Sequence, residues 1–447
     1  MKSLFVGNSL KARSLRTTAL AVASLGGENI LRLASNLILT RILFPEVFGL
    51  MALVQLFLTG LKMFSDTGIR QAIIQNPRGE EPDFLNTAWT AQIIRGVILW
   101  ACTCALALPA AALYGEPLLA QILPVAAFSL VISGFMTTKV LTNNRNLTIG
   151  QQTITQLSVK TIEIIISVTL AWWLQSVWAL VIGNLASSFL SLLANHRFLP
   201  GQTNRLHWDW EIARELFGFG KFIFLSTAVT FVTTNGDRAI LGAYISLAEL
   251  GVYNIGYFLG ALPLLVYQAV MGRVVFPYYR LKPIAGNLEN KRKIFQVRRL
   301  VIASGLLGTF IMSASGIALI DLLYDSRYAL AGPVVVVLSL SLVPRLVLNS
   351  YGAIFMSSGD TRQVFYLSAS TAAVQTVLMF VGVTWLGILG VMIAPGLAIM
   401  ITYPFRIRAV RRHNAWDPLA DAVLLSAGYL INGFFIWWHW DQVVKLI

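Results

Sequence analysis

The sequence predicts an all-α protein that crosses a membrane many times, and three observations carry that prediction. Of the 447 residues, 56% are hydrophobic and only 12% are charged, whereas soluble domains carry about 25% charged residues. Apolar runs of at least about 18 residues recur along the whole chain, and each is long enough to cross the hydrocarbon layer. These runs lack the alternation of a membrane β-barrel, so we expect helices.

Thirteen segments are apolar and long enough to span the membrane. They lie near residues 19–40, 47–66, 87–109, 117–138, 153–174, 177–195, 217–237, 250–272, 298–320, 331–356, 364–385, 387–405 and 419–440. We therefore predict about 12–13 transmembrane helices in two six-helix bundles, residues 1–200 and 210–410. An additional C-terminal transmembrane helix is expected in residues 417–447.

A weak internal repeat supports the two bundles. The stretch 41–50 resembles the stretch 238–252, and Gly49 matches Gly251 at an offset of 202. Residues 141–146 match residues 355–360 more loosely, at an offset of 214. Each predicted unit holds six spans, an even number, so the two units insert the same way up as parallel repeats.

Charge placement predicts the orientation. With the N-terminus in the cytoplasm, 25 of the 34 Lys and Arg residues fall in inner segments. Only four fall in outer segments: Arg41, Arg238, Arg327 and Lys445. The formal charge of +14 thus reflects cytoplasmic loops rather than nucleic-acid binding. We expect a multi-pass membrane protein with its N-terminus in the cytoplasm.

Chemistry-bearing motifs are missing from the sequence. It has no Walker-type phosphate loop, and its four His residues show no metal-ligand spacing. No Ser/His/Asp arrangement stands out, and no large outer loop could form a catalytic domain. We predict a protein that is not an enzyme, with no catalytic residue, no metal and no cofactor.

Subtracting the inner and outer cations leaves five cations within the predicted spans, and two acids accompany them. Each costs about 2.5–3.5 kcal/mol at mid-membrane unless it has a partner or a wet cavity. They are the cations Arg32, Lys62, Arg95, Lys160 and Arg345 and the acids Glu28 and Glu163. The surplus of cations predicts a positive lumen and an anionic substrate. Arginine suits phosphate because its planar fork donates two hydrogen bonds at once.

Four spans place polar residues on one helical face, with spacings of three or four. The stripes are Glu28, Arg32, Ser35 and Asn36; Gln156, Lys160, Glu163 and Ser167; Ser226, Thr230, Thr233 and Asp237; and Ser341, Arg345, Asn349 and Gly352. We interpret them as the walls of a shared polar lumen.

Purely structural roles remain as alternatives for the same residues. Glu28 with Arg32, and Lys160 with Glu163, have the spacing of self-neutralised helix pairs. Lys62 lies near an inner end, where snorkelling is expected, and Arg95 is ambiguous. Asp237 and Arg238 border the outer interface, where a structural hairpin role is as plausible as a functional one.

Residues 41–50, 237–242 and 250–254, with Phe276-Pro277, resemble the Wzx-type polysaccharide and O-antigen flippases of the multidrug/oligosaccharidyl-lipid/polysaccharide (MOP) exporter superfamily. The resemblance covers roughly residues 15–410 and implies the MATE-like fold of that superfamily. It implies a flippase that moves undecaprenyl-diphosphate-linked oligosaccharide from the inner to the outer leaflet by alternating access. The resemblance also implies that the flippase lies in the bacterial inner membrane. The units it moves would serve the synthesis of exopolysaccharide, capsule or lipopolysaccharide O-antigen.

Combined with the stripes, the resemblance suggests roles for individual residues. Gly49, Gly251, Asp237 and Arg238 are candidates for gating or for the hairpin. Glu28 and Glu163 are candidates for ion coupling. The hypothesised substrate-binding residues are Arg32, Arg345, Glu28, Asn36, Lys160, Asn349 and Arg95. Lipid-linked oligosaccharide and membrane lipid are the expected partners, with polysaccharide polymerase or export machinery as a further candidate.

Two other functions remain as alternatives. The first is a multidrug or small-solute antiporter of the same superfamily; a pump for organic cations should have an acidic lumen. The second is a membrane glycosyltransferase or polymerase, against which the short outer loops argue.

Overall fold

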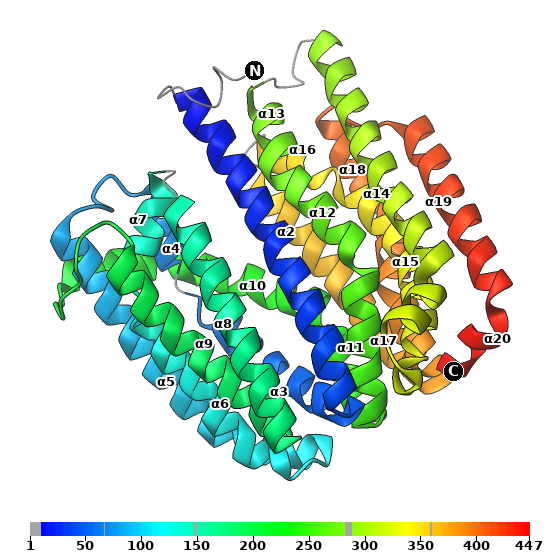
Figure 1. Cartoon of the computed structure of the whole chain (residues 1–447). Coiled ribbons are helices and arrows are strands. Elements are labelled where there is room, and N and C mark those ends of the chain that lie inside the picture. The colour runs from blue at the N-terminus through cyan, green and yellow to red at the C-terminus, as the bar shows by residue number, and fades with distance from the viewer. Residues whose placement is uncertain (1–9, 67, 147–149, 282–287, 358–359) are drawn as a thin grey trace. The chain divides into compact units, whose positions relative to one another are not determined.

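The computed structural model describes residues 10–66, 68–146, 150–281, 288–357 and 360–447 (Figure 1). All regular secondary structure in these ranges is helical, which confirms the predicted class. The first residues of the predicted cytoplasmic N-terminus, 1–9, lie outside the described part. The chain divides into two compact units, Met1–Ala228 and Val229–Ile447. The division falls inside α10 (Trp210–Tyr244).

Unit 1 is a helical bundle in which sequence neighbours pack as antiparallel pairs. Its elements are α2 (Leu10–Ile42), α3 (Pro45–Phe64), α4 (Ile69–Gln75), α5 (Pro82–Tyr114), α6 (Leu118–Gly134), α7 (Lys139–Arg145), α8 (Gly150–Leu174) and α9 (Val177–Phe198). Helix α5 packs along α6, α8 along α9 and α2 along α8. Glycine permits the close α5–α6 approach, since a Cβ on Gly96 would lie 2.7 Å from the Leu130 carbonyl oxygen.

Unit 2 is organised around α15, whose residues are almost all buried. Its elements besides the end of α10 are α11 (Leu247–Gly260), α12 (Leu262–Val270), the π-helix η1 (Met271–Val275), α13 (Phe276–Leu281), α14 (Leu288–Leu323), the 3₁₀-helix η2 (Ser326–Tyr328), α15 (Ala331–Asn349), α16 (Gly352–Ser357), α17 (Thr361–Ile401), α18 (Tyr403–Arg412), α19 (Pro418–Trp438), α20 (Trp440–Val443) and the 3₁₀-helix η3 (Val444–Leu446). Helices α11, α14, α17 and α19 all contact α15.

Helix α17 is in fact two antiparallel helices joined at Gly387. The backbone there has φ 55° and ψ −133°, a combination open essentially to glycine. A Cβ on Gly382 would lie 2.8 Å from the Gly390 carbonyl, although residues eight apart in a continuous helix are separated by about 12 Å. The chain therefore reverses at Gly387, as the two predicted spans 364–385 and 387–405 require.

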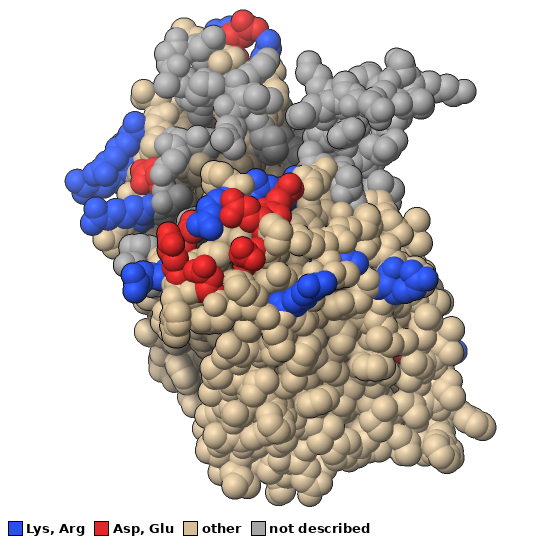
Figure 2. Space-filling model, turned by 90° about the vertical axis from the view of Figure 1, so that its left-hand side faces the viewer, with Lys and Arg blue, Asp and Glu red and all other residues tan. Residues whose placement is uncertain are grey.

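Each of the thirteen predicted spans falls on one helix of the structure or on consecutive helices. For example, span 250–272 covers α11, α12 and the start of η1, and span 331–356 covers α15 and α16. Within the described residues, eight helices are long and apolar enough to cross a membrane, or up to ten if each of two bent pairs is one span. Two long helices, α2 and α10, lie outside that set. They carry Glu28, Arg32 and Asp237, whose polarity lowers their hydropathy. Figure 2 shows how charged side chains gather in a band, beside a wide surface almost without them.

The opening of unit 2 differs from the prediction in one respect. We expected Asp237 and Arg238 to border a connection outside the membrane. Instead α10 continues to Tyr244 and α11 begins at Leu247, so the turn is only two residues long. A capping box between Ser246 and Glu249 explains why α11 begins there.

A buried ion pair fastens α19 to the rest of unit 2. Arg298 on α14 is fully buried and pairs with Asp421 on α19. Tyr351 and Tyr403 each donate a hydrogen bond to the same carboxylate, at 2.7 and 2.8 Å. Arg298 also donates to Ser350 Oγ at 2.8 Å. Arg298, which the charge count places in an inner segment, thus has a fully buried side chain.

This buried pair predicts a large effect of one substitution. Asp421→Ala removes the carboxylate that is hydrogen-bonded to the buried Arg298 guanidinium and leaves Asp417, 4.0 Å away, as its remaining counter-ion among the described residues. We expect a loss of up to about 3–5 kcal/mol of folding free energy. Thermal denaturation of the detergent-solubilised protein measures it. The matched control is Glu289→Ala on the same helix α14, which removes an exposed pair with Lys293; exposed pairs contribute about 0.2–1 kcal/mol. Equal effects of the two substitutions would show that the Arg298–Asp421 pair adds no more than a surface pair.

Candidate functional site

Unit 1 contains a polar cavity of about 700 Å³ between α2, α3, α8 and α9. We call it the polar cavity. Its polar lining residues are Glu28, Asn29, Arg32, Ser35, Asn36, Gln55, Gln156, Lys160, Glu163, Ser167, Asn184, Ser187 and Ser191. Since α3, α8 and α9 are among the helices apolar enough to span a membrane, these groups form a polar interior within an otherwise apolar bundle.

Two of the four predicted polar stripes meet in this cavity. The stripe of α2 and the stripe of α8 face each other because the two helices pack closely, with the Cβ position of Gly27 3.1 Å from Leu157. The hypothesised substrate residues Glu28, Arg32, Asn36 and Lys160 all line the cavity, as does Glu163.

Lys160 and Glu163 form an ion pair on α8, with Lys160 Nζ 2.8 Å from Glu163 Oε1. The second carboxylate oxygen accepts a hydrogen bond from Ser187 Oγ of α9 at 2.7 Å. The pair therefore has the self-neutralised form that its spacing allowed, and Ser187 ties it to the neighbouring helix.

The cavity is balanced in charge. Arg32 and Lys160 are its cations, and Glu28 and Glu163 are its acids. The predicted surplus of positive charge does not gather here, because Lys62 and Arg95 line another cavity and Arg345 belongs to unit 2. A single lumen for all five cations stays a prediction.

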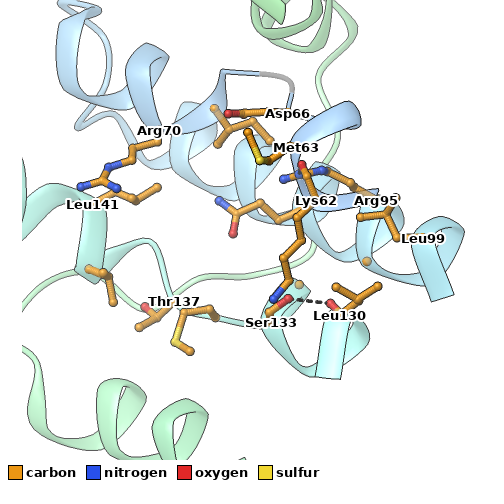
Figure 3. A pocket seen from close by; sticks show the side chains of 16 residues that line it. Lys62, Met63, Asp66, Arg70, Arg95, Leu99, Leu130, Ser133, Thr137 and Leu141 are labelled. Atoms are coloured by element: carbon orange, nitrogen blue, oxygen red, sulfur yellow. Dashed lines mark hydrogen bonds between the residues drawn. The ribbon is translucent and has the colours of Figure 1, made fainter. Parts of the chain in front are cut away.

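Arg95 and Lys62 line the second cavity of unit 1, of about 480 Å³ (Figure 3). Arg95 donates to Ser65 Oγ at 2.9 Å and to the Lys62 carbonyl oxygen at 2.7 Å. Arg95 thus satisfies the C-terminal end of α3, and none of its contacts joins it to the polar cavity. Arg95, whose role the sequence left open, therefore lies beside Lys62 in this second cavity.

In unit 2, Arg345 is half-buried on α15. Its guanidinium lies 3.5 Å from the Thr233 carbonyl oxygen of α10, and Gln375 of α17 donates to the same oxygen at 3.2 Å. Within the part of the chain that the structure describes, no carboxylate forms an ion pair with Arg345. It is the one charged group of the α15 stripe, as predicted, and it faces α10 and α17.

Asn349 accepts a hydrogen bond from Arg406 of α18 at 2.8 Å. Burial lowers the pKa of Arg406 to about 10, so it remains protonated at neutral pH. Thr371 Oγ1 accepts a second hydrogen bond from Arg406, at 3.2 Å. Asn349 is therefore engaged with a cation of its own unit.

The hairpin residues make specific contacts within unit 2. Asp237 is buried and accepts a hydrogen bond from the Tyr253 hydroxyl at 2.5 Å. Arg238 donates to Asn254 Oδ1 at 2.7 Å and lies 4.5 Å from the centre of the Tyr257 ring. Gly251 is buried on α11, and its repeat counterpart Gly49 is buried on α3. These contacts join α10 to α11, in agreement with a structural role for Asp237 and Arg238 in the hairpin.

Sequence reasoning missed one wall of the polar cavity. Asn184, Ser187 and Ser191 of α9 line it, and Gln55 of α3 completes it. The α9 residues are spaced by three and four, like the residues of the four predicted stripes. They were not predicted because none of them is charged.

Among the described residues, no group of three or more His, Cys, Asp or Glu side chains could hold a metal ion. The polar cavity offers hydrogen-bonding and charged groups from four helices.

The chain is similar to known proteins both in sequence and in fold. The sequence profile of a family described as "polysaccharide biosynthesis protein" matches residues 38–282, more than half of the chain. The chain is 24% identical over 336 residues to the succinoglycan biosynthesis transport protein ExoT of Rhizobium meliloti (strain 1021), covering 73% of this chain and 65% of that one. It is 23% identical over 176 residues to the teichuronic acid biosynthesis protein TuaB of Bacillus subtilis (strain 168), covering 39% and 36%. The alignments thus span about two thirds and one third of these relatives.

Solved structures show the fold. The lipid II flippase MurJ in an inward closed conformation superposes with a TM-score of 0.72 at 13% identity, covering 95% of this chain and 99% of that one. An inward-facing multidrug resistance MATE family transporter of the MOP superfamily superposes with a TM-score of 0.54 at 14% identity, covering 96% of both chains. ExoT, MurJ and the MATE protein are named for transport or flipping and not for catalysis, which agrees with the prediction of a protein that is not an enzyme.

The family match and the shared fold lead to one conclusion: the chain belongs to the polysaccharide biosynthesis protein family and has the multi-helical membrane fold of the MOP superfamily.

Proposed function

We propose that this protein is a flippase for lipid-linked precursors of a polysaccharide. Its cargo is an oligosaccharide repeat unit on undecaprenyl diphosphate, which it moves from the inner to the outer leaflet of the bacterial inner membrane by alternating access. The observation that carries the proposal is the polar cavity inside a bundle of membrane-spanning helices, in a chain whose family is that of polysaccharide biosynthesis proteins.

The lining of the polar cavity suits a glycan. Sugar hydroxyls lose their hydrogen bonds to water when they enter an apolar layer, and each unsatisfied group costs several kcal/mol. Amides and hydroxyls replace these bonds because they both donate and accept. The cavity supplies them from Asn36, Asn184, Ser35 and Ser191. A volume of about 700 Å³ is within the roughly 300–1,000 Å³ of small-ligand sites.

Arg32 is the group that we assign to the diphosphate. It lines the cavity and its side chain is exposed. A guanidinium donates two parallel hydrogen bonds to a phosphate. Arg345 is our second candidate, because no carboxylate among the described residues forms an ion pair with it.

The membrane potential supplies the direction of transport. Moving one elementary charge across 100 mV is worth about 2.3 kcal/mol. An anionic diphosphate leaves an inside-negative cell favourably, so the potential can drive the cycle without ATP. Proton or sodium coupling through Glu28 or Glu163 is the alternative.

The competing function is a multidrug or small-solute antiporter of the same superfamily, since the MATE transporter shares the fold. The family match favours the polysaccharide precursor. Reconstitution separates the two, because a flippase moves labelled undecaprenyl diphosphate oligosaccharide in proteoliposomes while an organic-cation pump moves ethidium. Movement of ethidium without movement of the lipid-linked sugar would refute the proposal.

Arg32→Gln should slow the flipping of labelled undecaprenyl diphosphate oligosaccharide by about 10- to 100-fold, because a hydrogen bond to a charged group is worth roughly 1.5–3 kcal/mol. Protection of the label from a membrane-impermeant quencher gives the rate. The matched control is Arg41→Gln, which removes the same charge from the last turn of the same helix, away from the cavity. If both variants transport at the wild-type rate, Arg32 has no part in binding the cargo.

Glu163→Gln should lower the melting temperature, because it leaves Lys160 without its ion-pair partner in the cavity wall. The double variant Lys160→Gln/Glu163→Gln should recover most of that loss. The response of flipping to a valinomycin-imposed potential should stay unchanged in both. A wild-type response to an imposed proton or sodium gradient that disappears in Glu163→Gln would instead make Glu163 the coupling residue.

A further inference from the structure

The second cavity of unit 1 is basic, and we call it the basic cavity. It lies at the C-terminal end of α3 and is lined by Lys62, Arg70 and Arg95 with a single acid, Asp66. In Figure 3, Lys62 points toward Ser133, Arg70 lies near Leu141, and Arg95 lies on the Leu99 side. Three cations from α3, α4 and α5 thus surround one space of about 480 Å³.

Two of these cations have no partner within the part of the chain that the structure describes. Among the described residues, neither the Lys62 ammonium nor the Arg70 guanidinium makes a hydrogen bond or an ion pair. Arg95 is fixed by its bonds to Ser65 and the Lys62 carbonyl. The Asp66 carboxylate accepts a hydrogen bond from the Gly68 amide at 3.0 Å, which holds the turn into α4. The basic cavity therefore presents a net positive charge to whatever enters it.

An apolar groove adjoins the basic cavity. This groove of about 290 Å³ shares Ile69, Arg95 and Leu99 with it and continues past Ile94 and Ile98 of α5. Ile94 and Ile98 are 46% and 55% exposed on a helix that is apolar enough to span a membrane. The groove thus runs along an exposed apolar surface of α5, and Arg95 joins it to the basic cavity.

We propose that the basic cavity and its groove bind an anionic phospholipid. The phosphate enters among Lys62, Arg70 and Arg95, and an acyl chain lies along Ile94 and Ile98. The headgroup phosphate supplies the negative counter-charge that Lys62 and Arg70 lack among the described residues. The groove accepts the hydrocarbon chain. The rest of the basic cavity is largely apolar, with Leu99, Leu130 and Leu141 in its wall, so it suits a small headgroup better than a glycan. This inference does not depend on the proposed cargo.

The test uses the full chain in detergent, with dioctanoyl phosphatidylglycerol as the probe and dioctanoyl phosphatidylcholine as the zwitterionic comparison. Binding is measured by native mass spectrometry and by the shift of the melting temperature. The wild type should retain phosphatidylglycerol in preference to phosphatidylcholine. The variant Lys62→Gln/Arg70→Gln should bind phosphatidylglycerol about 25-fold more weakly, because each Lys or Arg near an anionic lipid adds about fivefold in affinity.

The variant is chosen so that it still folds, since Lys62 and Arg70 make no side-chain bonds within the described protein. The matched control Arg197→Gln/Arg205→Gln removes two exposed cations from the same unit and should bind like the wild type. Equal retention of the two lipids, or equal loss in control and variant, would overturn the site.

Two further ligands in the same binding assay distinguish the possible sources of the phosphate. Glycerol 1-phosphate, which has the headgroup chemistry but no chain, should not shift the melting temperature. Undecaprenyl phosphate should not displace phosphatidylglycerol at equal concentration. A full shift with glycerol 1-phosphate, or displacement by undecaprenyl phosphate, would overturn the assignment to phospholipid in favour of a free phosphate or of the transported lipid.

Discussion

A polar group in an apolar layer must find a partner, and this constraint organises the whole molecule. The chain places Lys160 and Glu163 on α8, which carries no other charge. Glu28 and Arg32 lie on α2, and Arg298 lies on α14, beside long apolar stretches of the same helices. Each of these groups would cost several kcal/mol if it faced lipid. Helix packing therefore has to bring polar side chains to one another or to a cavity, and both solutions occur here.

The two solutions lead to different physical roles. Arg298 is buried between α14, α15 and α19, where it pairs with Asp421 and stacks on the Tyr351 ring. Tyr351 and Tyr403 both donate hydrogen bonds to the Asp421 carboxylate. Such a buried network fixes one arrangement of helices. Arg32 instead lines an open polar cavity. A cation that keeps access to a cavity can exchange its partners, which a binding site requires.

Unit 1 keeps two cavities of different character. The polar cavity is rich in amides and hydroxyls and balanced in charge, whereas the basic cavity carries unpartnered cations and continues into an apolar groove. A sugar and a phospholipid headgroup need these two different environments. Separate sites would let a lipid stabilise the unit without competing with the cargo.

The sequence by itself determined the membrane class and the positions of the helices. Hydropathy over windows of about 20 residues reports directly on lipid exposure, so the thirteen spans fall on helices, even at Gly387, where two helices meet. Helical periodicity also placed Glu28 with Arg32, and Lys160 with Glu163, on single faces, because that relation is local. The resemblance identified the superfamily from the stretches around residues 41–50 and 237–254.

Only the tertiary structure decided which polar faces meet. The stripes of α2 and α8 share the polar cavity because these helices pack at Gly27 and Leu157, a contact between residues 130 apart in the chain. Lys62 and Arg95 separate from that cavity because Arg95 bonds to the end of α3. Arg298 is buried because Asp421, 123 residues later, reaches it. A net charge counted along a sequence cannot predict such groupings, since the electrostatics of a site depend on distances that folding alone sets.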